Sequence, residues 1–317
     1  MSGENGGLAL SRAFYAECGR DILRRRLPEF FSRMAVGLVG EGSECFGFDD
    51  AVSRDHDWGP AFCVWLPAKE LEASREPILA ALCELPGEFR GHATRLNPPS
   101  PADRVGPLSI EGFYERFIGL PHPPRHWREW RIIPEHSLAV CVNGEVFEDA
   151  PGMFTSFRGA LLAYYPEDVR LKKLAARCVD LAQAGQYNLP RMRCRGDADA
   201  ALFCAARFAE KAVSCVFLLN RRYAPFYKWA ARGARTLPQL GMEAGEMLDA
   251  LARCRWTDPE DRERAQEAVE GFCAQVAAEL RRQDLSDAGS DWLLEHAESV
   301  RTRITTPELR EMPLPLE

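Results

Sequence analysis

The pattern of apolar and polar residues changes near residue 154. Before it, short apolar runs are separated by turns rich in glycine and proline, whereas after it apolar residues recur at helical spacing over long stretches. Short apolar runs between turns are typical of strands, and helical spacing is typical of amphipathic helices. We therefore predict an α+β fold, with a small mixed β-sheet domain over residues 1–153 and a C-terminal helical bundle over residues 154–317.

Within the first region, the apolar runs predict strands at residues 34–39, 61–66, 88–96 and 145–147. Helices are expected at residues 11–34, 77–85, 109–119 and 125–142, with interruptions at Pro28 and Pro134. Ser109 is a suitable N-cap for the third of these helices. Residues 97–107 contain four prolines and are expected to form a loop.

The second region shows no strand-like alternation. Helices are predicted at residues 157–165, 166–184, 197–223, 226–235, 242–254, 258–283 and 290–303. The last dozen residues contain three prolines and are expected to form a surface tail.

Composition indicates a protein of the cytoplasm. The sequence is 46% hydrophobic and 27% charged, and it has no apolar run long enough for a membrane helix and no signal-peptide layout at its N-terminus. Its eleven cysteines are odd in number, lack CxxC spacing and lie mostly among apolar residues, as expected for buried, reduced thiols. We therefore expect a cytoplasmic protein with no membrane association.

The overall charge bears on possible partners. A formal net charge of −7 argues against general affinity for nucleic acid, because binding to the phosphate backbone requires a positive surface. Specific binding to RNA through a local basic groove remains open. The basic and aromatic run at residues 125–131 is better explained by an ordinary amphipathic helix.

The clearest chemical pattern is a glycine-serine pair followed by two spaced acids. Gly42 and Ser43 suit a turn whose amides bind phosphate, and Asp55 and Asp57 lie two residues apart before an apolar run. On an extended strand, both carboxylates face the same side and provide hard oxygen ligands for Mg²⁺. His56 then faces the opposite side.

Two simpler structures would also account for the acids. An acidic surface turn is one, since Asp49 and Asp50 also lie in this segment. A calcium loop is the other, but Pro60 stands where its glycine belongs and Leu66 where its bidentate glutamate belongs, so we reject it.

These residues resemble the signature of the nucleotidyltransferase superfamily. More narrowly, the chain is similar over roughly residues 35–240 to an uncharacterised bacterial family of nucleotidyltransferase-like domains of unknown function. The resemblance is carried by Gly42-Ser43-Glu44, Gly47, the run 55–60, the segments 144–149 and 164–169, and Arg222, Tyr223, Pro225, Lys228 and Trp229. It implies a fold like that of the antibiotic-modifying nucleotidyltransferases, with a mixed sheet and a helical bundle.

The resemblance also implies an activity. The protein would be an enzyme that transfers a nucleoside monophosphate from a nucleoside triphosphate, with ATP as the expected donor, to an unknown hydroxyl acceptor on a small molecule, an RNA or a protein. Asp55 and Asp57 would bind Mg²⁺ or Mn²⁺, and Gly42 and Ser43 would bind the β- and γ-phosphates. A toxin-like regulatory nucleotidyltransferase is a variant of this hypothesis.

The third acid that the superfamily usually adds is less clear. The predicted strand 88–96 has no carboxylate after Glu88, and the remaining candidates are Glu111, Glu145, Glu148 and Asp149. We favour Asp149 because it follows a short strand, although an aspartate before a Pro-Gly pair is also a common turn residue. With an incomplete acid set, the protein would instead be a noncatalytic nucleotide-binding or scaffold protein.

Candidate residues in the helical half are fewer. Lys228 is a candidate for contacting a phosphate and Tyr223 for stacking on a base, although both also fit a helix surface beside core aromatics. Lys172, Lys173 and Gln186 are weaker candidates. A zinc site built on the histidines is not expected, because no cysteine lies at ligand spacing.

Overall fold

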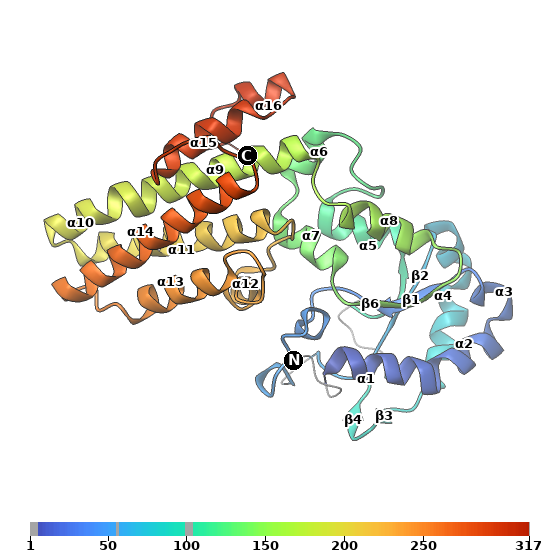
Figure 1. Ribbon diagram of the computed structural model, residues 1–317. Helices are drawn as coiled ribbons and strands as arrows, with labels where there is room; N and C mark the ends of the chain where they lie inside the picture. Colours follow the sequence, from blue (N-terminus) through green and yellow to red (C-terminus); the bar gives the residue numbers. More distant parts are fainter. Residues whose placement is uncertain (1–5, 55–56, 99–103, 317) are drawn as a thin grey trace. The chain divides into compact units, whose positions relative to one another are not determined.

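The structure is a computed structural model that describes residues 6–54, 57–98 and 104–316, and the chain folds into two compact units (Figure 1). Unit 1 contains residues 1–124 and 137–163, and unit 2 contains residues 125–136 and 164–317. The predicted α+β class is confirmed, since a small mixed sheet is accompanied by many helices. The boundary lies at residues 163–164 rather than the predicted 153–154, and residues 125–136 belong to the helical unit.

A four-stranded sheet forms the centre of unit 1, in the order β5-β2-β1-β6. The strands are β1 (Ala35–Leu38), β2 (Cys63–Leu66), β5 (Gly106–Ser109) and β6 (Glu145–Asp149). β1 is antiparallel to both β2 and β6, and β2 is parallel to β5. The first two strands consist of apolar residues and glycine and are fully buried, as expected for the middle of a sheet.

The edge strand β5 lies partly in the segment that was predicted to be a loop. It contains Pro107, which pairs with Val64 of β2. Proline has no N–H to donate and is therefore tolerated mainly on edge strands. The four prolines of the segment conceal the strand in the sequence.

Helices cover both faces of the sheet. Val64 and Leu66 lie in the same apolar core as Phe14 and Leu23, whereas Trp65 stacks on Phe154 with ring centroids 4.0 Å apart. This alternation follows from the strand geometry, in which neighbouring side chains point to opposite faces. The first face is covered by α1 (Gly7–Phe14), α2 (Arg20–Arg26) and α4 (Ala68–Leu82), and the second by α5 (Ile110–Ile118) and α8 (Met153–Leu162).

Smaller elements complete unit 1. A π-helical turn, Tyr15–Gly19, joins α1 to α2, and α3 spans Pro28–Phe31. The predicted strand 88–96 is instead a short hairpin of β3 (Glu88–Phe89) and β4 (His92–Ala93). The chain also crosses from unit 2 back to unit 1 within α7 (Glu135–Val142), after His136.

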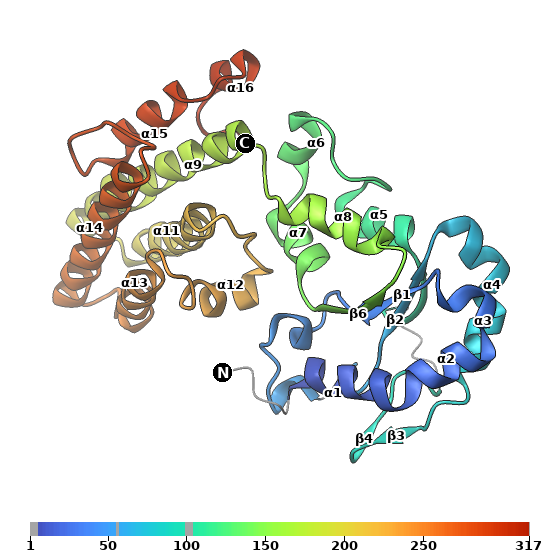
Figure 2. The same cartoon turned by 45° about the vertical axis from the view of Figure 1, so that its right-hand side comes forward.

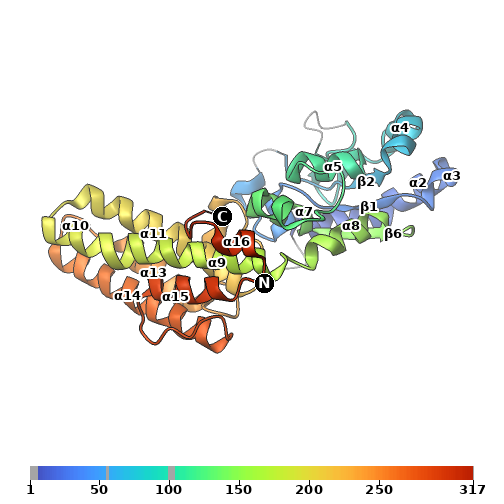
Figure 3. The same ribbon diagram turned by 90° about the horizontal axis from the view of Figure 1, so that it is seen from above.

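Unit 2 is helical throughout the part that the structure describes. Its helices are α6 (Trp127–Ile132), α9 (Glu167–Leu181), α10 (Leu189–Arg195), α11 (Ala198–Leu219), α12 (Tyr227–Ala234), α13 (Gly241–Arg253), α14 (Pro259–Arg282), α15 (Leu293–Thr302) and α16 (Pro307–Glu311). A π-helical stretch, Ala182–Asn188, makes α9 and α10 one continuous rod. Figures 2 and 3 show this rod running alongside α11 and α14.

The C-terminal segment is packed, contrary to the predicted surface tail. Leu309 on α16 is fully buried. Lys172 on α9 is also buried, and its Nζ donates to the backbone oxygens of Pro313 and Leu314 at 2.7 and 3.2 Å. A buried lysine needs hydrogen-bond acceptors, and the C-terminal segment provides them for the ammonium group of Lys172.

All eleven cysteines are free, and six are buried. Burial was predicted for most of the cysteines and is found for these six. Among the described residues, no helix has the length and apolar character needed to cross a membrane.

Candidate functional site

The first candidate site is the turn that follows β1 in unit 1, formed by Gly40–Cys45 and here called the Gly42 turn. Asn143 fixes its start: the Asn143 side chain accepts from the Gly40 N–H at 3.0 Å and donates to the Gly40 oxygen at 2.7 Å. Its end is held by the Gly144 N–H, which donates to the Cys45 oxygen at 2.7 Å. The turn is therefore anchored by residues just before β6.

Arg95 joins the Gly42 turn to residues 57–59, here called the acidic segment. Its guanidinium forms an ion pair with Glu44 of the turn at 3.1 Å and donates to the backbone oxygen of Asp57 at 2.7 Å. The side chains of Arg95 and Glu44 are only 10% and 5% exposed. Because buried charges require partners, this pair fixes the two segments together.

Gly42 has a specific steric role in this arrangement. A Cβ at this position would lie 2.3 Å from a carboxylate oxygen of Glu44. Glu44 is held by Arg95 and has little freedom to move aside. A larger residue at this position would therefore require the Glu44 carboxylate to shift away from its place beside Arg95.

Asp57 lies beside the same turn. Asp57 and Gly42 both line a hollow of about 20 Å³, roughly the space of one water molecule. Asp57 has a positive φ of 51° and precedes β2, so it does not lie on an extended strand as predicted. Its carboxylate is 3.4 Å from Arg104, which also lies 3.8 Å from Glu41.

The predicted partner acid, Asp55, and His56 lie outside the described residues. Three carboxylates of the described segments line the hollow, and each is paired with an arginine: Glu41 with Arg104 and Arg116, Glu44 with Arg95, and Asp57 with Arg104. Among the described residues, no group of three or more metal-ligating side chains is found. The described residues of the Gly42 turn therefore do not by themselves form a metal site.

None of the candidate third acids lies at the hollow in the described structure. The register of the sheet pairs Asp149 with Ala35, at the end of β1 opposite the Gly42 turn, and its Oδ2 accepts from the Thr155 N–H at 2.7 Å. Asp149 thus has the turn-forming role that was the alternative interpretation. The other three have structural partners as well: Glu111 accepts from Ala68, Glu145 pairs with Arg12, and Glu148 accepts from Tyr15 and Arg20.

The two candidates of the helical half have no visible binding role either. Tyr223 is buried in a cluster with Tyr164 and Tyr165, at ring-centroid distances of 4.8 and 5.1 Å, so its ring belongs to a core. Lys228 is exposed on α12, with its Nζ 5.4 Å from the ring centroid of Trp229. We do not assign a nucleotide contact to either residue.

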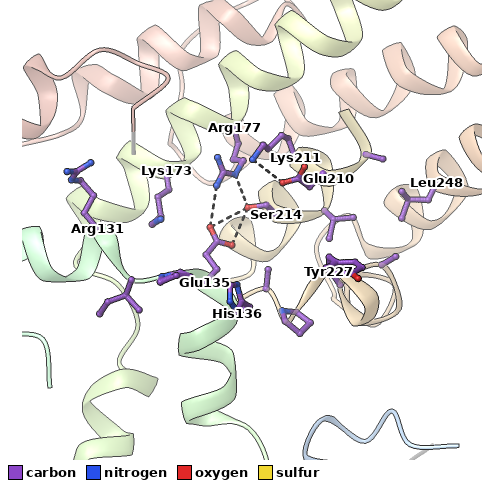
Figure 4. Close-up of a pocket in the computed structure, with 18 of the residues that line it drawn as sticks. Arg131, Glu135, His136, Lys173, Arg177, Glu210, Lys211, Ser214, Tyr227 and Leu248 are labelled. Carbon is purple, nitrogen blue, oxygen red and sulfur yellow. Dashed lines mark hydrogen bonds and ion pairs between the residues drawn. The ribbon is translucent and has the colours of Figure 1, made fainter. Parts of the chain in front are cut away.

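Unit 2 contains the larger cavity, of about 540 Å³, here called the basic pocket. The end of α6, residues 133–134, the start of α7, and helices α9, α11, α12 and α13 line it. Pro134 lies between α6 and α7, where a proline interrupts the helical hydrogen bonding as predicted. Figure 4 shows Lys173 and Arg177 extending from α9, Lys211 beside them from α11, and Tyr227 on another side.

An ion-paired network forms the floor of the basic pocket. Arg177 lies 3.5 Å from Glu135, and its Nε donates to the Ser214 Oγ at 2.8 Å, while that hydroxyl lies 3.2 Å from Glu135 (Figure 4). Arg177 and Glu135 are 6% and 13% exposed. The side chains are therefore held in place before any ligand enters.

Residues 130–230 match a family described as a domain of unknown function, DUF4037. No curated protein and no solved structure matches the chain. The matched range is narrower than the predicted resemblance at residues 35–240 and leaves out the Gly42 turn and Asp57. It includes all residues that line the basic pocket except Ala231 and Leu248.

Lys173 was a candidate from the sequence, whereas most other residues of the basic pocket were not predicted. Lys173 and Arg177 are four residues apart on one helix, a spacing that places both on one face and is visible in the sequence. The convergence of Glu135, Lys211 and Ser214 on them depends on tertiary packing and has no local signal.

Proposed function

We propose that the protein binds a nucleoside triphosphate at the Gly42 turn and transfers its nucleoside monophosphate part to a hydroxyl acceptor. The observation that carries this proposal is that Gly42 and Asp57 line one hollow. Arg95 holds their two segments together with a buried ion pair. A site for phosphate transfer depends mainly on such positioning and on charge neutralisation.

Arginines support triphosphate binding at this turn. Arg104 and Arg116 are 43% and 45% exposed and both pair with Glu41. Guanidinium groups form two parallel hydrogen bonds with phosphate oxygens. Binding would exchange the pairing of these arginines with Glu41 for pairing with phosphate.

The proposed reaction is an in-line displacement. The acceptor oxygen forms a bond to the α-phosphorus, the bond between that phosphorus and the α–β bridging oxygen breaks, and pyrophosphate leaves with the electron pair. The acceptor proton is released to a base or to solvent. A need for Mg²⁺ or Mn²⁺ remains part of the proposal through Asp55 and Asp57, and the assay below tests it directly.

The alternative is a noncatalytic nucleotide-binding protein. It is favoured by β5, the neighbour of β2, whose residues Gly106–Ser109 include no carboxylate. It is also favoured by the structural partners of Asp149. A protein lacking the third acid would bind the triphosphate without transferring it.

An assay with α-labelled ATP, GTP, CTP or UTP separates these hypotheses. The chain is incubated with each nucleotide, with and without Mg²⁺ or Mn²⁺, and pyrophosphate release, self-labelling and nucleotide binding are measured. For an active enzyme, we expect the Asp55→Asn/Asp57→Asn double variant to lose label transfer by a factor on the order of 100 or more. Asp21→Asn, which changes an exposed carboxylate of α2, is the matched control.

Each result selects one hypothesis. Metal-dependent transfer that is lost in the double variant supports the enzyme. Saturable binding without pyrophosphate release supports the noncatalytic alternative. Transfer that is unchanged in the double variant, or no binding of any nucleotide, contradicts the proposed site.

A further inference from the structure

The basic pocket has the dimensions of a ligand site and lies wholly within unit 2. Its volume of about 540 Å³ falls within the range of small-molecule sites, roughly 300–1,000 Å³. Its lining is drawn from segments far apart in the sequence, from Arg131 to Leu248. Nothing proposed above for the Gly42 turn uses it.

The lining carries an excess of positive charge. Four cationic side chains, Arg131, Lys173, Arg177 and Lys211, face two carboxylates, Glu135 and Glu210. The lining therefore has two positive charges more than negative ones, and Asp180, which lies outside the lining 3.6 Å from Arg177, offsets part of this excess. An anionic ligand would balance the remainder.

Burial makes this charge selective for an anion. Lys173 is 4% exposed, and the Arg177 and Lys211 side chains are 6% and 14% exposed. Charges shielded from water interact more strongly with a bound ion than charges on an open surface do. The same excess repels a polycationic ligand.

The remaining lining is apolar. Ile133, Val213 and Leu248 contribute aliphatic surface, and Tyr227 contributes an aromatic ring. A pocket that combines apolar walls with a few fixed polar groups is typical of small-molecule sites. The ligand should therefore have an apolar or aromatic body as well as an anionic group.

We propose that the basic pocket binds a phosphate monoester whose phosphate contacts Lys173, Arg177 and Lys211 and whose organic part contacts the apolar walls. A phosphate monoester has a charge of about −1.5 to −2 at neutral pH, opposite in sign to the excess on the lining. Arg177 is already positioned by Glu135 and Ser214, so little ordering is required on binding. A nucleoside monophosphate and a simple aryl phosphate share this chemistry.

Calorimetric titration of the full chain tests the proposal, with phenyl phosphate as the first probe. AMP tests the nucleotide source, inorganic phosphate tests the anion alone, and phenol tests the apolar body alone. We expect saturable binding of phenyl phosphate that is stronger than that of inorganic phosphate, and no measurable binding of phenol. If AMP binds more tightly than phenyl phosphate, the natural ligand is a nucleotide; if not, it is another phosphate ester.

Two substitutions locate the binding. Lys211→Gln and Lys173→Gln should each weaken phenyl phosphate binding by about tenfold or more, the usual loss when a charged hydrogen-bond donor is removed. Lys211 is the more exposed of the two, so its variant remains informative if Lys173→Gln fails to fold. Arg195→Gln, an equal charge change at an exposed position of α10, should leave binding unchanged.

The outcomes also separate this pocket from the Gly42 turn. Binding that is lost in Lys211→Gln and kept in Asp57→Asn supports the basic pocket, whether or not the chain transfers nucleotides. Binding that is kept in Lys211→Gln and lost in Asp57→Asn would place the phosphate at the turn and overturn the inference. Absence of saturable phenyl phosphate binding would overturn it as well.

Discussion

Arg95 is the residue on which the geometry of the Gly42 turn depends most. It contacts Glu44 through an ion pair and the acidic segment through the backbone oxygens of Asp57 and Gly59. Removing one partner of a buried ion pair leaves the other charge buried and uncompensated, which is more costly than the loss of the pair itself.

We predict that Arg95→Met lowers the free energy of unfolding of unit 1 by about 3 kcal/mol or more. Arg95→Met/Glu44→Gln should recover part of this loss, because no buried charge is left unpaired. Urea unfolding followed by tryptophan fluorescence and circular dichroism measures both. Equal stability of the single variant and the wild type would show that the pair does not hold the two segments.

Asp168 gives unit 2 a pH-dependent contribution to stability. Burial raises the pKa of the Asp168 carboxyl, but hydrogen bonds from the side chains and N–H groups of Thr306 and Thr305 outweigh burial, and the net pKa is lowered. A carboxyl with a lowered pKa stabilises the fold above its unfolded pKa of about 3.9, and this stability is lost as the pH falls through the folded value.

Asp168→Asn should therefore cost about 1–3 kcal/mol at pH 7, and the difference from the wild type should shrink below about pH 4. Thermal unfolding of both proteins between pH 3 and pH 7 checks this expectation. A difference that grows as the pH falls would have the wrong sign and would refute the assigned role.

Individual residues of the site were only partly predictable from the sequence. The proximity of Gly42 and Asp57 follows from a turn between two strands that pair with each other. The contacts of Arg95 with Glu44 and Asp57 could not be predicted in this way, because these residues lie on segments that meet only in the folded chain. Asp149 was predicted to join the site, but it lies at the other end of the sheet. The pairing of β6 with β1 sets its position, and the sequence does not show this pairing.

At the scale of elements, α16 is held to unit 2 by buried Leu309 and by the hydrogen bonds of its N-cap residue Thr306 to Asp168, and Lys172 binds the segment that follows it. We predict that Leu309→Ala lowers the stability of unit 2 by about 2–4 kcal/mol, because it leaves a cavity where the side chain was. Leu316→Ala is the control, because Leu316 is 56% exposed. Chemical unfolding measures both, and equal effects of the two substitutions would show that α16 does not pack as described.

Helices were more predictable than strands in this chain. The long helices α11, α13 and α14 begin and end within a few residues of the predicted bounds, because their apolar spacing extends over several turns. A strand of four residues contains too few positions for its apolar spacing to distinguish it from a loop. β5 was missed for this reason and because proline normally indicates a loop.

For the molecule as a whole, the free cysteines predict a simple pattern of reactivity. Cys83 and Cys194 are exposed, whereas burial raises the pKa of Cys63 and of Cys215 to about 12. The thiolate is the reactive form, so buried thiols with raised pKa values react slowly. With iodoacetamide at pH 7.5, mass spectrometry should find Cys83 and Cys194 labelled first and the six buried cysteines labelled only on unfolding.

Labelling of buried cysteines at the same rate as Cys83 in the native protein would contradict the described cores. The unfolding midpoint should also be the same with and without a reductant, since no disulfide links the chain. A shift on adding the reductant would indicate a disulfide.

The two units present separate candidate sites, and the family match distinguishes them. The predicted site at the Gly42 turn lies outside the matched residues, while the basic pocket lies almost wholly within them. Apolar periodicity is enough to predict a helical bundle. It does not predict a pocket, because the lining comes from helices whose neighbours are set by tertiary packing.

Hydrogen–deuterium exchange of the full chain, with and without ATP and Mg²⁺, tests the proposed nucleotide site most directly. If the triphosphate binds at the Gly42 turn, the amides of residues 40–46 and 104–109 should exchange more slowly in its presence, and this protection should be lost in Asp55→Asn/Asp57→Asn. Protection confined to residues 131–136 and 209–214, or no protection anywhere at saturating ATP, would contradict the account.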